Sequence, residues 1–154
     1  MQKAKKKAFT LVEVLLVVVI IAILAAIVIV AINPARQISQ ANDTQRSTEV
    51  KALLDAVHEY AIDHRGVLPT DTTTDPVGEI TDTAQVLGSD TTNGQLNLCS
   101  ELVPTYIAEM PFDPQTGDYT SCTEYSTGYS ISQDGDRITV SATGEITTPI
   151  SVTR

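Results

Sequence analysis

One acidic residue stands beside a long apolar run and is the first candidate for chemistry. Glu13 follows Phe9-Thr10-Leu11-Val12 and directly precedes the run. An ionised carboxylate in lipid costs about 2.5–3.5 kcal/mol, so an acid inside a membrane segment is a functional candidate. The alternative is that Glu13 lies at the level of the lipid headgroups and reaches water. If it has a chemical role, that role is charge pairing.

Two histidines and three aspartates could bind a metal. His58 and His64 are six positions apart, not the four that put two ligands on one helix face, which favours solvated helix surface. Asp113, Asp134 and Asp136 could supply oxygens to calcium, although Asp-Gly-Asp is more typical of a turn. We therefore expect no cofactor, with these three aspartates as calcium candidates. The sequence has no G-x-S-x-G motif, and we expect no enzyme.

The apolar run predicts a membrane-spanning helix. Val14–Ile32 comprises 19 apolar residues without charge, Gly or Pro. As a helix they would extend roughly 28 Å, close to the hydrocarbon thickness of a bilayer, and lipid favours helix because backbone groups must be satisfied within the segment. Four lysines precede the run, which predicts a cytoplasmic N-terminus and an external remainder. They are Lys3, Lys5, Lys6 and Lys7.

Three interpretations of this N-terminus compete. A cleaved signal peptide should have a shorter apolar region and an A-x-A-like site, and Leu24-Ala25-Ala26 is a poor substitute. A plain signal anchor explains the length and the charge but not Glu13. The third interpretation, a processed leader followed by an assembling helix, explains the length, the charge and Glu13, and it rests on the motif described next.

Residues 5–16, Lys5-Lys6-Lys7-Ala8-Phe9-Thr10-Leu11-Val12-Glu13-Val14-Leu15-Leu16, resemble the leader and cleavage motif of the type IV pilin family, which includes the pseudopilins. The resemblance implies that residues 1–8 are a basic prepilin leader, cleaved between Ala8 and Phe9, and that Phe9 becomes N-methylated. The family usually has Gly before the cut, where this chain has Ala8. Glu13 then takes the fifth mature position, where the family has a Glu.

Physical chemistry gives Glu13 and Phe9 a role in assembly. Cleavage leaves a positive amine on Phe9, with which Glu13 of a neighbouring subunit can pair, and two charges that are each costly in lipid become less so together. Glu13 would thereby set the register of a helical homo-oligomer. The resemblance implies further partners: the membrane, prepilin peptidase and inner-membrane assembly machinery with an ATPase.

A long helix is predicted over residues 9–65, with 14–32 spanning the membrane. Asn33-Pro34 interrupts it, either as a kink or as a helix end, and Gly66 and Pro69 terminate it. Its second half is amphipathic, which predicts that it covers a folded partner. The apolar stripe consists of Val50, Leu53, Leu54, Val57, Tyr60 and Ala61.

Residues 66–154 are predicted to form an extracytoplasmic head with a small antiparallel sheet. Residues 129–133 and 137–141 alternate with period two around a loop, Asp134-Gly135-Asp136, and Gly144 allows another turn before residues 145–147. The fold class is thus α+β, with a long N-terminal transmembrane and amphipathic helix packed on that sheet, and the family resemblance implies that this fold is pilin-like.

The two cysteines, Cys99 and Cys122, both fall on the predicted outer side. Disulfides persist there, so a bridge is favoured over a metal site, with two free buried thiols as the alternative. The placement is similar to the disulfide loop of several pilins.

The charge of the head limits its partners. The chain has a net charge of −9, and residues 66–154 carry two basic residues against 13 acidic ones, so we expect no direct nucleic acid binding. The leading hypothesis is a structural subunit of a type IV pilus-like filament. The alternatives are a pseudopilin of a type II secretion or DNA-uptake system, whose filament is periplasmic, and a signal-anchored surface domain that never assembles.

Overall fold

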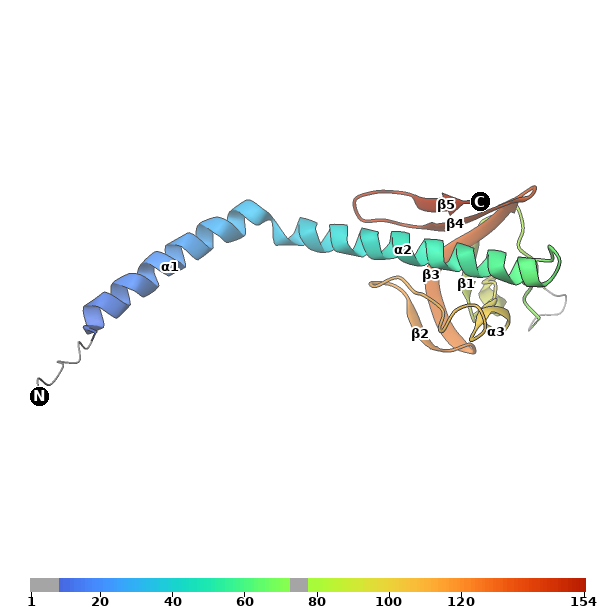
Figure 1. Cartoon of the computed structure of the whole chain (residues 1–154), viewed down its shortest axis with the longest axis horizontal. Coiled ribbons are helices and arrows are strands. Elements are labelled where there is room, and N and C mark those ends of the chain that lie inside the picture. The colour runs from blue at the N-terminus through green and yellow to red at the C-terminus, as the bar shows by residue number, and fades with distance from the viewer. Residues whose placement is uncertain (1–8, 73–77) are drawn as a thin grey trace, which may run out of the picture. The chain divides into compact units, whose positions relative to one another are not determined.

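The computed structural model describes residues 9–72 and 78–154. Its contacts divide the chain into two compact units, with the boundary between Ile38 and Ser39. Two helices are followed by a small antiparallel sheet (Figure 1), which confirms the predicted α+β class. The second unit therefore starts within the amphipathic helix, whereas the sequence analysis placed the start of the head at residue 66.

Helix α1 (Leu11–Ile32) and helix α2 (Pro34–Asp63) are separated by one residue, Asn33, in the left-handed conformation with φ 47°. Pro34 has no N–H to continue α1, and its ring disfavours the helical conformation at the residue before it. Asn33 Oδ1 accepts a hydrogen bond from the Arg36 N–H at 3.4 Å, so the residue that ends α1 also caps α2. The single kinked helix predicted over 9–65 is therefore wrong, and the alternative of a helix end at Asn33-Pro34 is correct.

The second unit contains a five-stranded sheet. Its order is β1-β3-β4-β5, with β2 also pairing with β3, and every strand pairing is antiparallel. A 3₁₀ turn, η1 (Thr91–Asn93), and a short helix, α3 (Cys99–Leu102), lie in the connection between β1 and β2. The strands are β1 (Gln85–Gly88), β2 (Asp118–Ser121), β3 (Glu124–Asp134), β4 (Arg137–Ala142) and β5 (Ile150–Thr153).

The predicted hairpin is present as β3 and β4, with a tighter turn than expected. Asp134 pairs with Arg137, which leaves Gly135 and Asp136 as a two-residue loop, and Gly135 has a positive φ of 59°. Residues 145–147 belong to the connection between β4 and β5 and not to a strand. The last strand begins only at Ile150.

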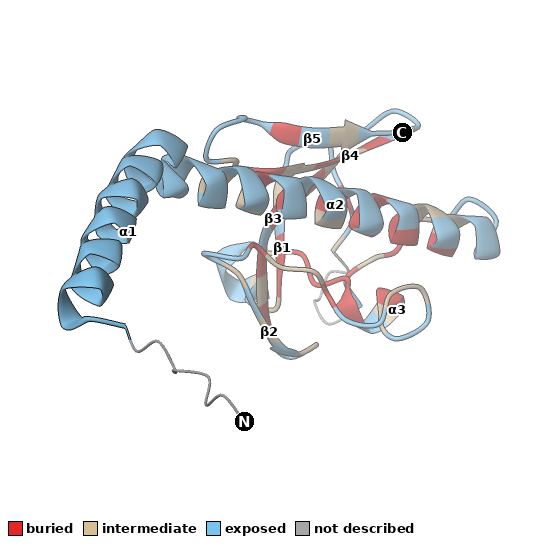
Figure 2. Cartoon of the chain, turned by 60° about the vertical axis from the view of Figure 1, so that its left-hand side comes forward, coloured by how far each residue is buried: buried red, intermediate tan, exposed pale blue. Residues whose placement is uncertain are grey.

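The core of the second unit forms between α2 and the sheet. Figure 2 shows buried residues along one side of α2 and on the strands beside it. The stripe predicted from the sequence is buried from Val50 to Tyr60, whereas Ala61 is half-buried. From the sheet, β3 and β4 contribute alternate residues: Tyr125, Tyr129, Ile131, Ile138, Val140 and Ala142.

Candidate assembly site and the buried arginine cluster

Helix α1 is apolar and exposed on every side. None of its 22 residues is buried, and in the part of the chain that the structure describes it is the one helix long and apolar enough to cross a membrane. At 1.5 Å per residue it extends about 33 Å, which matches a hydrocarbon core of about 30 Å. Such a helix requires lipid or other apolar helices around it.

Glu13 lies in the first turn of α1. Thr10 is the N-cap, and its Oγ1 accepts a hydrogen bond from the Glu13 N–H at 3.2 Å. Because a helix N-terminus carries partial positive charge, a carboxylate there is less costly than farther along the helix. The Glu13 side chain is exposed and makes no hydrogen bond or ion pair with any residue that the structure describes. Among the described residues, none competes for its carboxylate with a group from outside the monomer.

Phe9 precedes the cap, and its side chain is 79% exposed. Ala8, on the other side of the predicted cleavage point, lies outside the described residues, as does the rest of the basic leader. Cleavage and N-methylation at Phe9 remain predictions.

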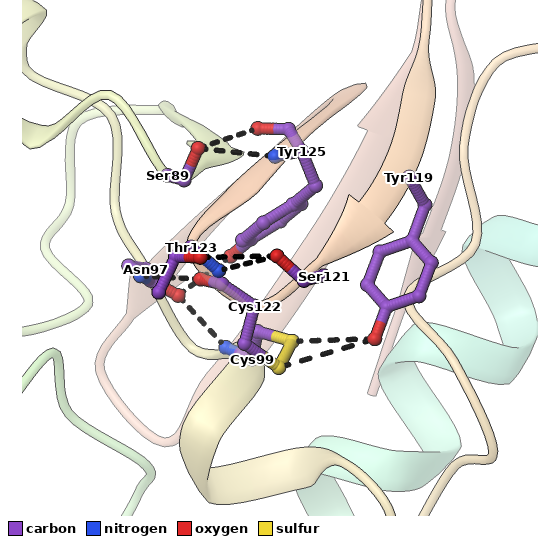
Figure 3. The surroundings of a disulfide bond; sticks show 8 residues. All are labelled: Ser89, Asn97, Cys99, Tyr119, Ser121, Cys122, Thr123 and Tyr125. Carbon is purple, nitrogen blue, oxygen red and sulfur yellow. Dashed lines mark hydrogen bonds between the residues drawn. A yellow bond between two sulfur atoms is a disulfide. The ribbon is translucent and has the colours of Figure 1, made fainter.

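The cysteines form the predicted bridge: Cys99 and Cys122 are joined by a disulfide (Figure 3). Cys99 is the first residue of α3, and Cys122 lies in the turn between β2 and β3. Asn97 braces this region, because its Oδ1 accepts from the Cys99 N–H at 3.1 Å and from the Tyr125 hydroxyl at 3.0 Å. The bridge therefore joins the turn between β2 and β3 to α3.

The calcium candidates are not brought together. Asp113 is buried and pairs with an arginine, whereas Asp134 and Asp136 lie at the β3–β4 turn. Among the described residues, no three His, Cys, Asp or Glu side chains form a group that could hold a metal ion.

The histidines also make separate contacts. His64 stacks on the Tyr60 ring with centroids 3.9 Å apart, and its Nδ1 lies 2.9 Å from the Tyr60 carbonyl oxygen. The Nε2 atom of His58 is buried without a hydrogen-bond partner among the described residues.

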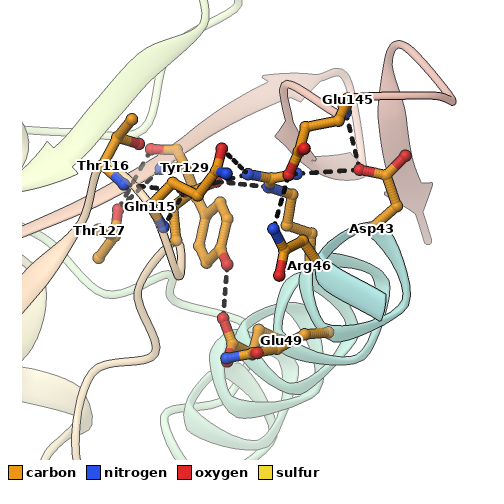
Figure 4. A network of polar contacts seen from close by, with 12 residues as sticks. Asp43, Arg46, Glu49, Gln115, Thr116, Thr127, Tyr129 and Glu145 are labelled. Carbon is orange, nitrogen blue, oxygen red and sulfur yellow. Dashed lines mark hydrogen bonds and ion pairs between the residues drawn. The ribbon is translucent and has the colours of Figure 1, made fainter. Parts of the chain in front are cut away.

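A buried arginine on α2 organises a cluster that sequence analysis missed (Figure 4). Arg46 is only 2% exposed. Its Nε and Nη2 donate to the two carboxylate oxygens of Asp113 at 2.6 and 3.2 Å. Its Nη1 donates to Asp43 at 2.9 Å and to Glu145 at 3.1 Å. The Asp113 hydrogen bonds, with those of Asp43 and Glu145, raise the pKa of Arg46 above its ordinary value.

The Asp43 carboxylate accepts hydrogen bonds from three consecutive backbone N–H groups. They belong to Glu145, Ile146 and Thr147, at 2.8, 2.9 and 2.9 Å. These hydrogen bonds, those of Thr147 and Glu145 foremost, hold the pKa of Asp43 far below its usual value. Burial alone would raise the pKa of Asp113, but Arg46 and two backbone N–H groups outweigh burial and lower it.

A second polar contact joins α2 to the middle of the sheet. The Tyr129 hydroxyl donates to Oε2 of Glu49, and Gln45 Nε2 donates to its Oε1 at 2.8 Å. Tyr129 is fully buried, and burial together with the Glu49 contact raises the pKa of its hydroxyl.

The sequence contains one signal for this cluster. Arg46 lies four positions before Val50 and Asp43 three positions before Arg46, so both continue the apolar stripe of α2 towards its N-terminus. Charged residues at stripe positions indicate buried pairing, but the stripe does not identify the partners.

Comparison with known proteins bears on the N-terminus alone. Residues 3–29 match the family described as "Prokaryotic N-terminal methylation motif". No curated protein and no solved structure gives a significant match. The matched segment contains the lysines, Ala8, Phe9, Glu13 and most of α1. The N-terminus of this chain therefore carries the prokaryotic N-terminal methylation motif, the class III leader of type IV pilins and pseudopilins.

Proposed function

We propose that the protein is a structural subunit of a type IV pilus-like helical filament. It enters the membrane as a prepilin, prepilin peptidase cuts it between Ala8 and Phe9, and the mature subunits polymerise through α1. The N-terminus starts in the cytoplasm and the head outside. Assembly machinery with an ATPase in the inner membrane moves the mature subunits from the membrane into the growing filament.

One observation carries the proposal. Glu13 lies inside the methylation motif, at the start of an apolar helix exposed on all sides, and its carboxylate has no partner among the described residues. The only positive group that processing creates nearby is the new amine of Phe9. Within one filament, pairing of this amine with Glu13 of a neighbour satisfies both charges in a low-dielectric surrounding, where a lone charge is most costly.

Mass spectrometry of the N-terminus of the mature protein tests the processing. The expected species begins with N-methylated Phe9. An intact Met1 would indicate a permanent signal anchor, and a start near Ile27 would indicate a cleaved signal peptide; either result overturns the proposal.

Replacing Glu13 tests the assembly. Glu13→Leu should leave cleavage intact but abolish filaments, because the Phe9 amine then has no carboxylate to pair with. Glu109→Gln, an exposed acid in the head with no hydrogen bond or ion pair to a described residue, is the control and should assemble normally. Normal filaments from Glu13→Leu would refute the pairing.

The same N-terminus would serve a pseudopilin of a type II secretion or DNA-uptake system. The two roles differ in where the filament lies. Immunogold labelling of the head on filaments at the cell surface supports a pilus, and labelling confined to the periplasm at native expression supports a pseudopilus.

A further inference from the structure

Helix α2 is attached to the head in two chemically different ways. From Val50 onward its buried residues are mainly apolar, and they pack into the core with the sheet. Between Ser39 and Glu49 it has no buried apolar residue, and the two buried residues there are Asp43 and Arg46. The first three turns of α2 in this unit are thus held by polar contacts.

Most of these contacts go to one short connection, residues 144–147 between β4 and β5, which we call the strap. A carboxylate of the helix bonds to the strap, and a carboxylate of the strap bonds to the helix. Asp43 of the helix accepts the three consecutive N–H groups of the strap, as described above. In return, the Glu145 carboxylate of the strap accepts hydrogen bonds from Ser39 Oγ and Asn42 Nδ2, both at 2.7 Å, and from Arg46 Nη1.

Water has access to this contact from one side. An open groove of about 740 Å³ runs between α2 and the strap, and Asp43, Thr44, Ser47, Ile146 and Thr147 contribute to its lining. Hydrogen bonds that open here can be replaced at once by bonds to water, whereas separating the apolar residues from Val50 onward would expose hydrocarbon. The contacts between the helix and the strap therefore separate at a lower free energy than the apolar core, whereas the Arg46–Asp113 pair is buried and stays closed.

We propose that the strap forms a local opening unit, which releases from helix residues 39–43 while α2 stays held by the Arg46–Asp113 pair and packed from Val50 to Tyr60. Asp43 and Glu145 are the two residues that close it. Release separates the strap from α2 without unfolding the head. This inference concerns the monomer and holds whether or not the chain assembles.

Native-state hydrogen exchange on the full chain in detergent tests the proposal without any substitution. The N–H groups of residues 145–147 should exchange through an opening of lower free energy than that of residues 53–60, and low urea should barely affect its rate. Identical exchange free energies and urea dependence in the two segments would mean that they open only by global unfolding, which overturns the proposal.

Two substitutions test the closing residues. Asp43→Asn replaces an acceptor of three N–H groups by a weaker one, and Glu145→Gln weakens the bonds to Ser39 and Asn42. Each should speed exchange of residues 145–147 about ten- to hundredfold, the loss expected for hydrogen bonds to a charged group, and leave residues 53–60 unchanged. Glu109→Gln is the matched control and should alter neither segment. Unchanged exchange at residues 145–147, or equal acceleration at residues 53–60, would overturn the proposal.

Discussion

Arg46 and Asp113 are 67 positions apart in the sequence and form a buried two-point ion pair, with Nε–Oδ2 at 2.6 Å and Nη2–Oδ1 at 3.2 Å. The pair joins α2 to the turn before β2. Arg46 and Asp113 are the most buried charged residues of these two elements. Geometry of this kind is specific to arginine, because its planar fork matches both oxygens of a carboxylate.

Removing the arginine should destabilise the protein strongly. Arg46→Met leaves Asp113 and Asp43 buried without their cation, and breaking a buried pair on one side costs about 3–5 kcal/mol. Thermal unfolding of the full chain in detergent, followed by circular dichroism, measures the loss. Lys51→Met is the control, because Lys51 is exposed on the same helix and forms no ion pair with a described residue. A melting temperature equal to that of the control would contradict a structural role for the cluster.

Acid should weaken the same cluster. The folded-state pKa values of Asp43, Asp113 and Glu145 lie below their ordinary values of 3.8, 3.8 and 4.5. A carboxyl with a depressed folded-state pKa stabilises the fold above its unfolded pKa and loses that contribution as the pH falls through the folded-state value. Stability should thus be constant from neutral pH to about 5 and decline below about 4.

Urea unfolding measured across that range checks this pH dependence. Asp113→Asn should be less stable at neutral pH and show a smaller decline in acid, because one of the titrating carboxyls is gone. A decline of the same size in Asp113→Asn and in the unmodified chain would exclude Asp113 as a source of the acid sensitivity.

Alkali should act through the buried tyrosines. Burial, and for Tyr129 also the contact with Glu49, raises the pKa of Tyr129 and Tyr125 above the ordinary 10.0. A raised folded-state pKa means that stability is full below the unfolded value and is lost as the pH rises above it. Phenolate absorbance should show Tyr125 and Tyr129 ionising only together with unfolding. Early ionisation of every tyrosine in a chain that is still folded would contradict their burial.

The elements that follow from local pattern were predictable. An unbroken apolar run specifies α1, spacing of three and four specifies the stripe of α2 from Val50, and strict alternation specifies the strands around Gly135. The position of the break at Asn33 was predictable from the sequence. Whether it is a kink or a helix end was not, since a proline is compatible with either. Asn33 favours the helix end, because it tolerates the left-handed conformation and can cap the next helix.

The cluster and the strap depend on contacts that no local pattern encodes. Asp43 accepts hydrogen bonds from N–H groups 102 to 104 positions away, and although its stripe position indicates buried pairing, no sequence window around it identifies those partners. Strand β5 has only four residues, too few for a clear alternation pattern, and it is a strand because it pairs with β4. The proposed assembly residues are the opposite case, because Phe9 and Glu13 belong to a motif whose spacing is entirely local.

The disulfide gives the last prediction. Cys99 and Cys122 are separated by 23 positions, and closing a loop of that length stabilises a fold by about 3 kcal/mol in the chain-entropy model. Reduction should therefore lower the melting temperature of the full chain by about 10 °C, given the size of the second unit. The double variant Cys99→Ala and Cys122→Ala should melt near the reduced chain and should not respond to reductant. Since the bridge fixes α3 and the β2–β3 turn and not the arginine cluster, exchange at residues 145–147 should stay unchanged on reduction. An unchanged melting temperature, with both thiols shown to be free by alkylation, would mean that the core holds this segment without the bridge.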